Sequence, residues 1–202
     1  DETTSVDAAK RVLEKSGGIL ISIENKRERL VSFEKNSRQY RFDPNRMFTK
    51  KGAAASLEKN STHSSVEIVE TVLGFGQFIL DKIPKAAVTL VALHNNDEGR
   101  LSINSYYPGG ENAMDVEEAS RKKGQDPDNF FFTTDSSLYR QLKAGYNTVL
   151  QQNDKARDDG SLSVYYGQRN KSYVNVEAEH GQTREQEEMI RQLVSLLETG
   201  KR

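Results

Sequence analysis

The sequence predicts an α/β protein with three layers, in which helices cover both faces of a mixed and largely parallel β-sheet. Stretches with strand-like alternation are interspersed with stretches whose apolar residues recur at helical spacing. Residues 86–93 (AAVTLVAL) are apolar at nearly every position, which is typical of a strand covered on both faces. The 202 residues suffice for one domain with a substantial core and are too few for two ordinary ones, so we expect residues 1–202 to form a single domain.

The predicted elements follow one another closely in the first half of the chain. Residues 5–15 have apolar residues at helical spacing and stop at a pair of glycines, which predicts a short helix. Residues 19–23 and 29–33 are β-branched or alternate with polar residues, and each predicts a strand. Residues 65–80 present a broad apolar face and precede a proline, so a second helix is expected there. The buried strand at residues 86–93 then ends at a histidine.

The second half contains short elements and one long irregular segment. Residues 108–129 are rich in glycine, charge and turn signals, so we expect an exposed insertion loop that borders the cleft as a lid. By the criteria used above, strands are predicted at residues 101–107, 146–151, 162–166 and 173–177, and helices at residues 136–143 and 182–197.

Composition excludes several classes of function. The 29 basic and 30 acidic side chains nearly cancel, so no overall field favours nucleic acid as a partner. No apolar run approaches the roughly 20 residues that span a bilayer, and no membrane span is expected. The absence of cysteine excludes disulfides, thiolate zinc sites and cysteine nucleophiles. Composition does not decide between a cytoplasmic and a periplasmic or secreted location.

Polar residues at the ends of the most buried strands are the first candidates for a site, because ligands bind at the carboxyl ends of central strands in open α/β sheets. His94 ends one such strand and Glu177 ends another. An imidazole ligand and a carboxylate base are what a zinc-activated water requires. The same spacing also fits a hydrogen-bonded strand-end histidine and a solvated glutamate.

A second candidate is the segment RQYRFDPNRMF at residues 38–48. It resembles the R-x-x-x-x-D-x-N-R-x-F segment of the aspartoacylase and succinylglutamate desuccinylase branch of zinc carboxypeptidase-type hydrolases. The resemblance implies that Asn45 and Arg46 grip a substrate carboxylate and that Arg38 polarises the scissile carbonyl. A planar guanidinium beside an amide is a good bidentate receptor for a carboxylate. The alternative is a surface turn with a solvated Arg46.

The metal ligands are implied by two further matches. Residues 93–99 (LHNNDEG) resemble the family's D-L-H-[NT]-x-x-x-G segment, in which the histidine, here His94, binds zinc. The family's aspartate is Ala92 in this chain, which removes a carboxylate that would orient the imidazole. Residues 1–6 (DETTSV) are similar to the tail of H-x-x-E-x-x-x-V, so that Glu2 takes the place of the second ligand. The first ligand, a histidine, would stand two positions before Asp1.

The catalytic base is the last residue that the family resemblance implies. Val176 and Glu177, followed by Gly181, resemble the family's strand-end glutamate, which implies that Glu177 takes the proton from water and later protonates the leaving amine. Glu179 is a rival, because residues two apart on a strand share a face. The four segments occur in the family's chain order, and the resemblance implies the zinc carboxypeptidase-like (phosphorylase/hydrolase-like) fold.

The sequence therefore predicts a zinc-dependent metallohydrolase with one zinc ion per chain. Its substrate would be a small molecule or a peptide with a free carboxylate, cleaved at the neighbouring amide by a carboxypeptidase or an N-acyl amino acid deacylase reaction. One alternative is a catalytically inactive domain on the same fold that binds carboxylates or peptides, which Ala92 favours. Another is a hydrolase of the cell envelope that acts on peptidoglycan peptides.

Overall fold

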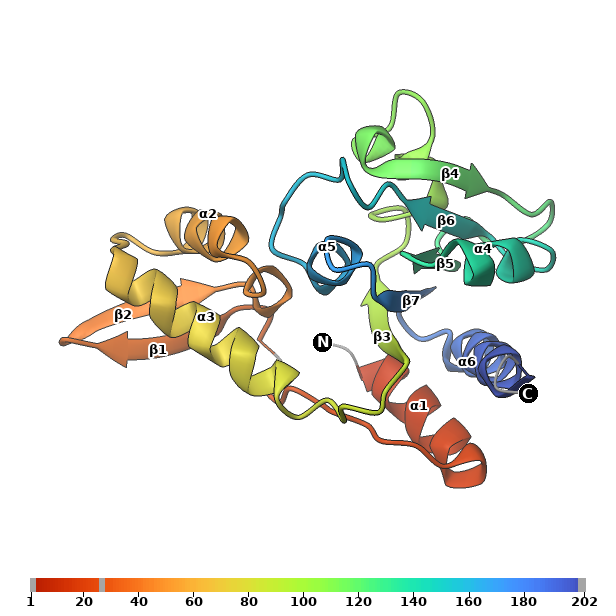
Figure 1. Cartoon of the computed structure of the whole chain (residues 1–202), viewed down its shortest axis with the longest axis horizontal. Coiled ribbons are helices and arrows are strands. Elements are labelled where there is room, and N and C mark those ends of the chain that lie inside the picture. Colours follow the sequence, from red (N-terminus) through yellow and green to blue (C-terminus); the bar gives the residue numbers. More distant parts are fainter. Residues whose placement is uncertain (1–2, 26–27, 200–202) are drawn as a thin grey trace.

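The computed structural model describes residues 3–25 and 28–199, and its centre is a five-stranded mixed sheet (Figure 1). The strand order is β3-β7-β5-β6-β4. The pairs β3–β7 and β5–β6 are parallel, whereas β7–β5 and β6–β4 are antiparallel. The strands are β3 (Thr89–Asn96), β4 (Val116–Ser120), β5 (Phe130–Thr133), β6 (Thr148–Gln151) and β7 (Ser172–Glu179).

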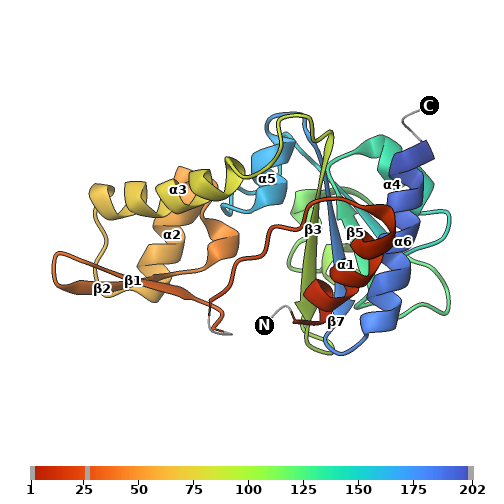
Figure 2. The same ribbon diagram turned by 90° about the horizontal axis from the view of Figure 1, so that it is seen from below.

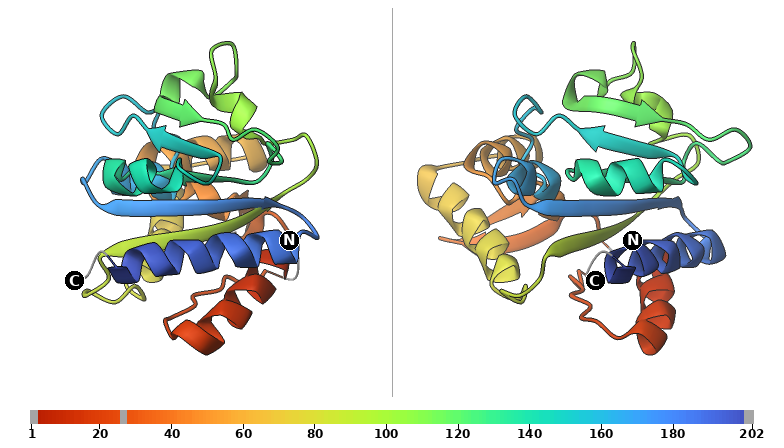
Figure 3. Two further views of the ribbon diagram at one scale, coloured as in Figure 1. Left: turned by 90° about the vertical axis from the view of Figure 1, so that its right-hand side faces the viewer. Right: turned by 45° about the vertical axis from the view of Figure 1, so that its right-hand side comes forward.

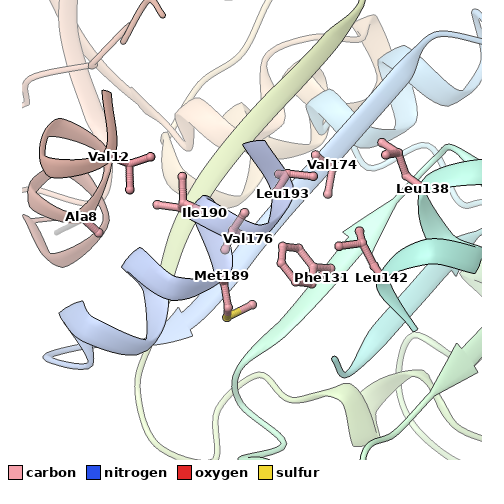
Figure 4. Close-up of a cluster of buried hydrophobic side chains, with 10 residues drawn as sticks. All are labelled: Ala8, Val12, Phe131, Leu138, Leu142, Val174, Val176, Met189, Ile190 and Leu193. Atoms are coloured by element: carbon pink, nitrogen blue, oxygen red, sulfur yellow. The ribbon is translucent and has the colours of Figure 1, made fainter. Parts of the chain in front are cut away.

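Three helices pack on one face of this sheet: α1 (Thr3–Ser16), α4 (Ser136–Leu142) and α6 (Thr183–Thr199). Figure 3 shows α6 running along the sheet, with α1 outside it. Met189, Ile190 and Leu193 of α6 insert between α1 and the strands, where they meet Val174 and Val176 of β7 (Figure 4). The period of the α6 pattern thus matches the face that it buries, as the amphipathic sequence predicts.

The opposite face of the sheet carries an aromatic core. Phe130, Phe132 and Tyr173 project from the strands and pack against Tyr166 and Ile103, which are buried. These two partners belong to α5 (Leu162–Gly167) and to the 3₁₀ turn η2 (Ile103–Tyr106), and a further 3₁₀ turn, η3 (Ala113–Asp115), precedes β4. The two faces give three layers, which agrees with the α/β prediction.

The remaining elements form what we call the hairpin lobe, residues 31–80. It consists of β1 (Val31–Lys35), β2 (Arg38–Phe42), the 3₁₀ turn η1 (Pro44–Arg46), α2 (Lys50–Asn60) and α3 (Val66–Leu80). A two-residue turn joins the antiparallel strands, with Asn36 and Ser37 at φ of 54° and 57°, as two-residue hairpin turns require. The lobe has its own apolar core around Phe42, Leu57 and Val72, and it lies beside α5 (Figure 2).

Several predicted elements are confirmed. Helices occupy the four predicted ranges with small shifts at their ends, and β1, β3, β6 and β7 overlap predicted strands. The predicted burial of residues 86–93 on both faces is wrong, because β3 is an edge strand that is only partly buried and Val88 before it is exposed. No helix in the described part of the chain is long and apolar enough to cross a bilayer. The mixed sheet is confirmed, but it is only partly parallel, since two of its four pairings are antiparallel.

Other predicted elements are wrong, for identifiable reasons. The run at residues 162–166 is helix α5, because the Ser161 side chain accepts a hydrogen bond from the Val164 N–H and caps a helix. Residues 101–107 contain the 3₁₀ turn η2, which begins where the Ser102 hydroxyl accepts from the Asn104 N–H. Residues 19–23 have no partner strand and are largely exposed. The segment 108–129 is not wholly a loop, because it contains η3 and the edge strand β4.

Candidate functional site

A pocket of about 620 Å³ lies between the aromatic face of the sheet and the hairpin lobe. Four residues that the sequence singled out line it: Asn45, Arg46, His94 and Glu177. They come from the lobe, from β3 and from β7. The structure therefore brings together side chains that are more than a hundred positions apart in the chain.

His94 and Glu177 are direct neighbours in the sheet. The parallel register pairs His94 of β3 with Glu177 of β7, and paired residues project to the same face. Each strand continues for two residues beyond them, so both lie within the strands rather than at their ends. Glu177 is only 3% exposed, which makes it a buried carboxylate at the base of the pocket.

Asn175 contacts this carboxylate from the same strand. Its side-chain Nδ2 donates a hydrogen bond of 2.8 Å to Glu177 Oε2. Asn175 also lines the pocket, and its partner in the parallel register is Ala92. Asn175 is not among the site residues predicted from the sequence, although strand alternation alone places it on the face of Glu177.

The position of Asn45 and Arg46 follows from the turn that holds them. Asp43 caps η1 by accepting from the Asn45 N–H at 2.9 Å, and Pro44 fixes the backbone at the first helical position. Asp43 Oδ2 also accepts from Arg29 Nη2 at 2.8 Å. The Arg46 guanidinium forms an ion pair with Asp159 at 3.3 Å, in which both side chains are about two-fifths exposed, at 39% and 43%.

A tightly packed loop supports this side of the pocket. Gly160 has φ of +83°, and its carbonyl accepts a hydrogen bond from the Phe48 N–H at 3.0 Å. A Cβ on Gly160 would lie 2.4 Å from the Arg46 carbonyl oxygen, and one on Gly52 would lie 2.1 Å from the Gly160 Cα. Thr49 donates a hydrogen bond of 2.6 Å to Asp158 in the same loop. The backbone contact fixes Arg46 against the loop, and the glycines make that approach sterically feasible.

Arg157 ties together two further loops of the pocket wall. Its guanidinium donates to both carboxylate oxygens of Asp115, and also to the Glu111 carbonyl and to the Asn112 side chain. Burial alone would raise the pKa of Asp115, but the hydrogen bonds and the charge of Arg157 outweigh it and lower the pKa below its usual value. The first part of segment 108–129 is therefore fastened to the pocket.

Two tyrosines complete the interior of the pocket. Burial raises the pKa of Tyr106 and of Tyr173, and the negative charge of Glu177 raises both further. Both phenols therefore remain protonated at neutral pH and present neutral rings and hydroxyls next to the buried carboxylate.

The remaining predicted site residues have different positions. Arg38 begins β2 beside the hairpin turn and does not line the pocket, so the structure does not bring it together with Arg46. Glu2 lies outside the described residues. Glu179 is absent from the pocket wall and accepts a hydrogen bond from Gln182, while desolvation and then Asp126 raise its pKa. Of the two glutamates that the sequence left open, Glu177 is the one in the pocket.

The beginning of α1 is held at the end of β3. The Ser5 N–H donates to Asn95 Oδ1 at 3.0 Å, and Thr4 Oγ1 lies 3.0 Å from His180 Nδ1. Asn95 in turn donates to the buried Gln186 of α6 at 3.0 Å. The residues that follow Glu2 are thus fixed next to the strand position after His94, and His180 contributes to this contact rather than to the pocket wall.

The imidazole of His94 and the carboxylate of Glu177 are side chains of the kind that bind zinc, but they are only two. Imidazole nitrogen and carboxylate oxygen are both ordinary zinc ligands. Within residues 3–25 and 28–199, however, no three His, Asp or Glu side chains are grouped so that they could hold a metal ion.

Comparisons with protein-family models, with curated proteins and with solved structures gave no significant match.

Proposed function

We propose that this protein is a zinc-dependent hydrolase that cleaves an amide bond beside a free carboxylate. The supporting observation is that Asn45, Arg46, His94 and Glu177 line one pocket. Three separate sequence segments resemble the zinc carboxypeptidase-type family. Nothing in their spacing requires these residues to lie in the same pocket. Their presence in one pocket supports the three roles that the resemblance implies: carboxylate receptor, metal ligand and base.

Arg46 and Asn45 would bind the substrate carboxylate. The ion pair of Arg46 with Asp159 is partly exposed, and pairs of this kind contribute about 1 kcal/mol or less. A substrate carboxylate that binds the planar guanidinium through two hydrogen bonds gains more than this. The exchange of Asp159 for substrate is therefore energetically feasible, and Asn45 supplies an amide donor beside it.

His94 and Glu2 would be the zinc ligands within this chain, and the family resemblance places a third ligand upstream of Asp1. When bound, zinc would polarise the scissile carbonyl and make the attacking water more acidic. Glu177 would accept the proton of that water and transfer it to the leaving nitrogen. Its burial on the His94 face suits this role, because few solvent molecules compete for the carboxylate.

The test is a comparison of zinc content and hydrolysis across variants of the protein, expressed with whatever residues precede Asp1 in its gene. The wild type should bind about one zinc ion and cleave N-acyl amino acids or peptides. His94→Ala should lose the metal. Glu177→Gln should keep the metal and lose kcat. Arg46→Ala should raise KM about 10- to 100-fold, which corresponds to the loss of one charge-assisted contact.

Arg38→Ala is the matched control, because it removes an arginine of the same matched segment from a position outside the pocket. It should leave KM close to the wild-type value. A folded wild type that contains no zinc would refute the hydrolase. If it still bound carboxylates through Arg46, the inactive binding domain would be the better account.

A further inference from the structure

Asn175 is a polar residue of the pocket wall, and the two ends of its amide have different surroundings. It lies on β7 with Ala92 beside it on β3 and Phe132 beside it on β5, so small or apolar side chains surround it in the sheet. Its Oδ1 atom is buried and accepts no hydrogen bond from any described residue. A buried acceptor without a partner destabilises the fold, so whatever Asn175 contributes comes from the other end of its amide.

The other end of the same amide has one clear contact. Nδ2 donates to Glu177 Oε2 at 2.8 Å, so the amide orientation is fixed by the carboxylate, which can only accept. Asn175 and Glu177 project to the same face of one strand, and both line the pocket. The donor therefore restricts where the Glu177 carboxylate can point.

Ala92 of β3 is the neighbour of Asn175 in the sheet. The residue at position 92 of β3 is an alanine, so this position of β3 supplies no polar side chain. In the parallel register the residue opposite Ala92 is Asn175, so the polar side chain at this level of the sheet comes from the neighbouring strand. Its amide donates to Glu177.

We propose that Asn175 is a positioning residue that orients the Glu177 carboxylate for proton transfer. This inference rests on the proposed function, because it assigns Asn175 to the base of that reaction. Groups that orient reacting residues in this manner typically change activity by about 10- to 100-fold when removed.

The experiment compares Asn175→Leu, which has a similar size and no donor, with Asn175→Ser, which keeps a shorter donor. In Asn175→Leu, kcat should fall about 10- to 100-fold while KM stays within about two-fold, measured at a temperature where the variant is fully folded. Asn175→Ser should recover part of kcat. Glu179→Gln is the control, because it changes the next same-face position of β7 outside the pocket and should leave kcat unchanged.

Crystal structures of the wild type and of Asn175→Leu separate this inference from the proposed function. A displaced Glu177 carboxylate in the variant supports the positioning role, even if the wild type proves to have neither zinc nor activity and the hydrolase proposal fails. An unmoved carboxylate overturns it, as does an active variant with unchanged kcat. A loss of kcat that is fully explained by unfolding of the variant at the assay temperature overturns it as well, since the role would then be structural.

Discussion

Gly160 provides a sharp test of how the pocket is assembled, because it lies where the loop after β6 meets the hairpin lobe. In Gly160→Ala the new Cβ would lie 2.4 Å from the Arg46 carbonyl oxygen and 2.6 Å from the Gly52 Cα. The backbone is at φ of +83°, where a side chain costs about 1–2 kcal/mol. The steric overlap and the conformational cost both arise at residue 160.

The magnitude follows from adding the separate costs. Overpacking against backbone typically costs about 1–3 kcal/mol. With the left-handed conformation, the loss is about 2–5 kcal/mol, a large part of the 5–15 kcal/mol that stabilises a typical domain. In a chain of this size each kcal/mol corresponds to roughly 2–4 °C, so the melting temperature should fall by about 4–20 °C.

The assay is thermal unfolding followed by circular dichroism, with Gly124→Ala as the matched control. Gly124 has φ of +84°, almost the same as Gly160, but a Cβ there would meet nothing within 4 Å. The control should therefore show only the conformational cost of about 1–2 kcal/mol. If the two variants are equally stable, Gly160 is not packed closely against η1, and the loop does not hold Arg46 in place.

Three further results are expected. Leu193→Ala removes a fully buried side chain between α1, α6 and the sheet, and should cost about 2–5 kcal/mol in urea unfolding. Ser161→Ala removes the cap of α5 and should cost about 0.5–2 kcal/mol; an unchanged urea midpoint would show that the cap contributes nothing. Asp115→Asn breaks the contact with Arg157. Because the folded-state pKa of Asp115 is lowered, its contribution is present above the ordinary carboxyl pKa and is lost as the pH falls through the folded value. The stability difference between wild type and Asp115→Asn should thus shrink from pH 6 to pH 3, and a constant difference would contradict the assignment.

The parts of the fold that depend on local periodicity could be read from the sequence. Helix α6 and strand β7 each carry a pattern that matches the face or faces they bury. Strand β3 has the apolar run of a strand covered on both faces, yet it lies at the edge of the sheet and is only partly buried. Short apolar runs were ambiguous, since LSVYY at residues 162–166 suits a strand by composition and becomes helix α5 because Ser161 caps it. Strand β5, with three consecutive phenylalanines, is not among the predicted strands, because so short an apolar run does not distinguish a buried strand from a buried helix segment.

Pocket residues could be predicted from the sequence where a local signal marked them, as with Asn45 and Arg46 on their turn and with His94 and Glu177 near the ends of two strands. Asn45 and Arg46 sit on a turn whose cap and proline are visible in the sequence. Arg38 belongs to the same matched segment, yet the five residues of β2 extend it toward the hairpin turn and away from η1. Arg157 and Asp115 come from different loops, and nothing in either local sequence indicates that they would meet.

The register of β3 against β7 connects the core to the chemistry. Val174 and Val176 face α6, and strand alternation then directs Asn175 and Glu177 to the pocket. A one-residue change in the facing of β7 would bury Glu177 among Met189 and Leu193 and expose two valines to the pocket, which is strongly unfavourable. The apolar contacts of α6 therefore fix the face on which the glutamate lies. The parallel pairing places Leu93 beside Val176, and it therefore places His94 beside Glu177. Packing on the far side of the sheet thus determines which polar residues meet in the pocket.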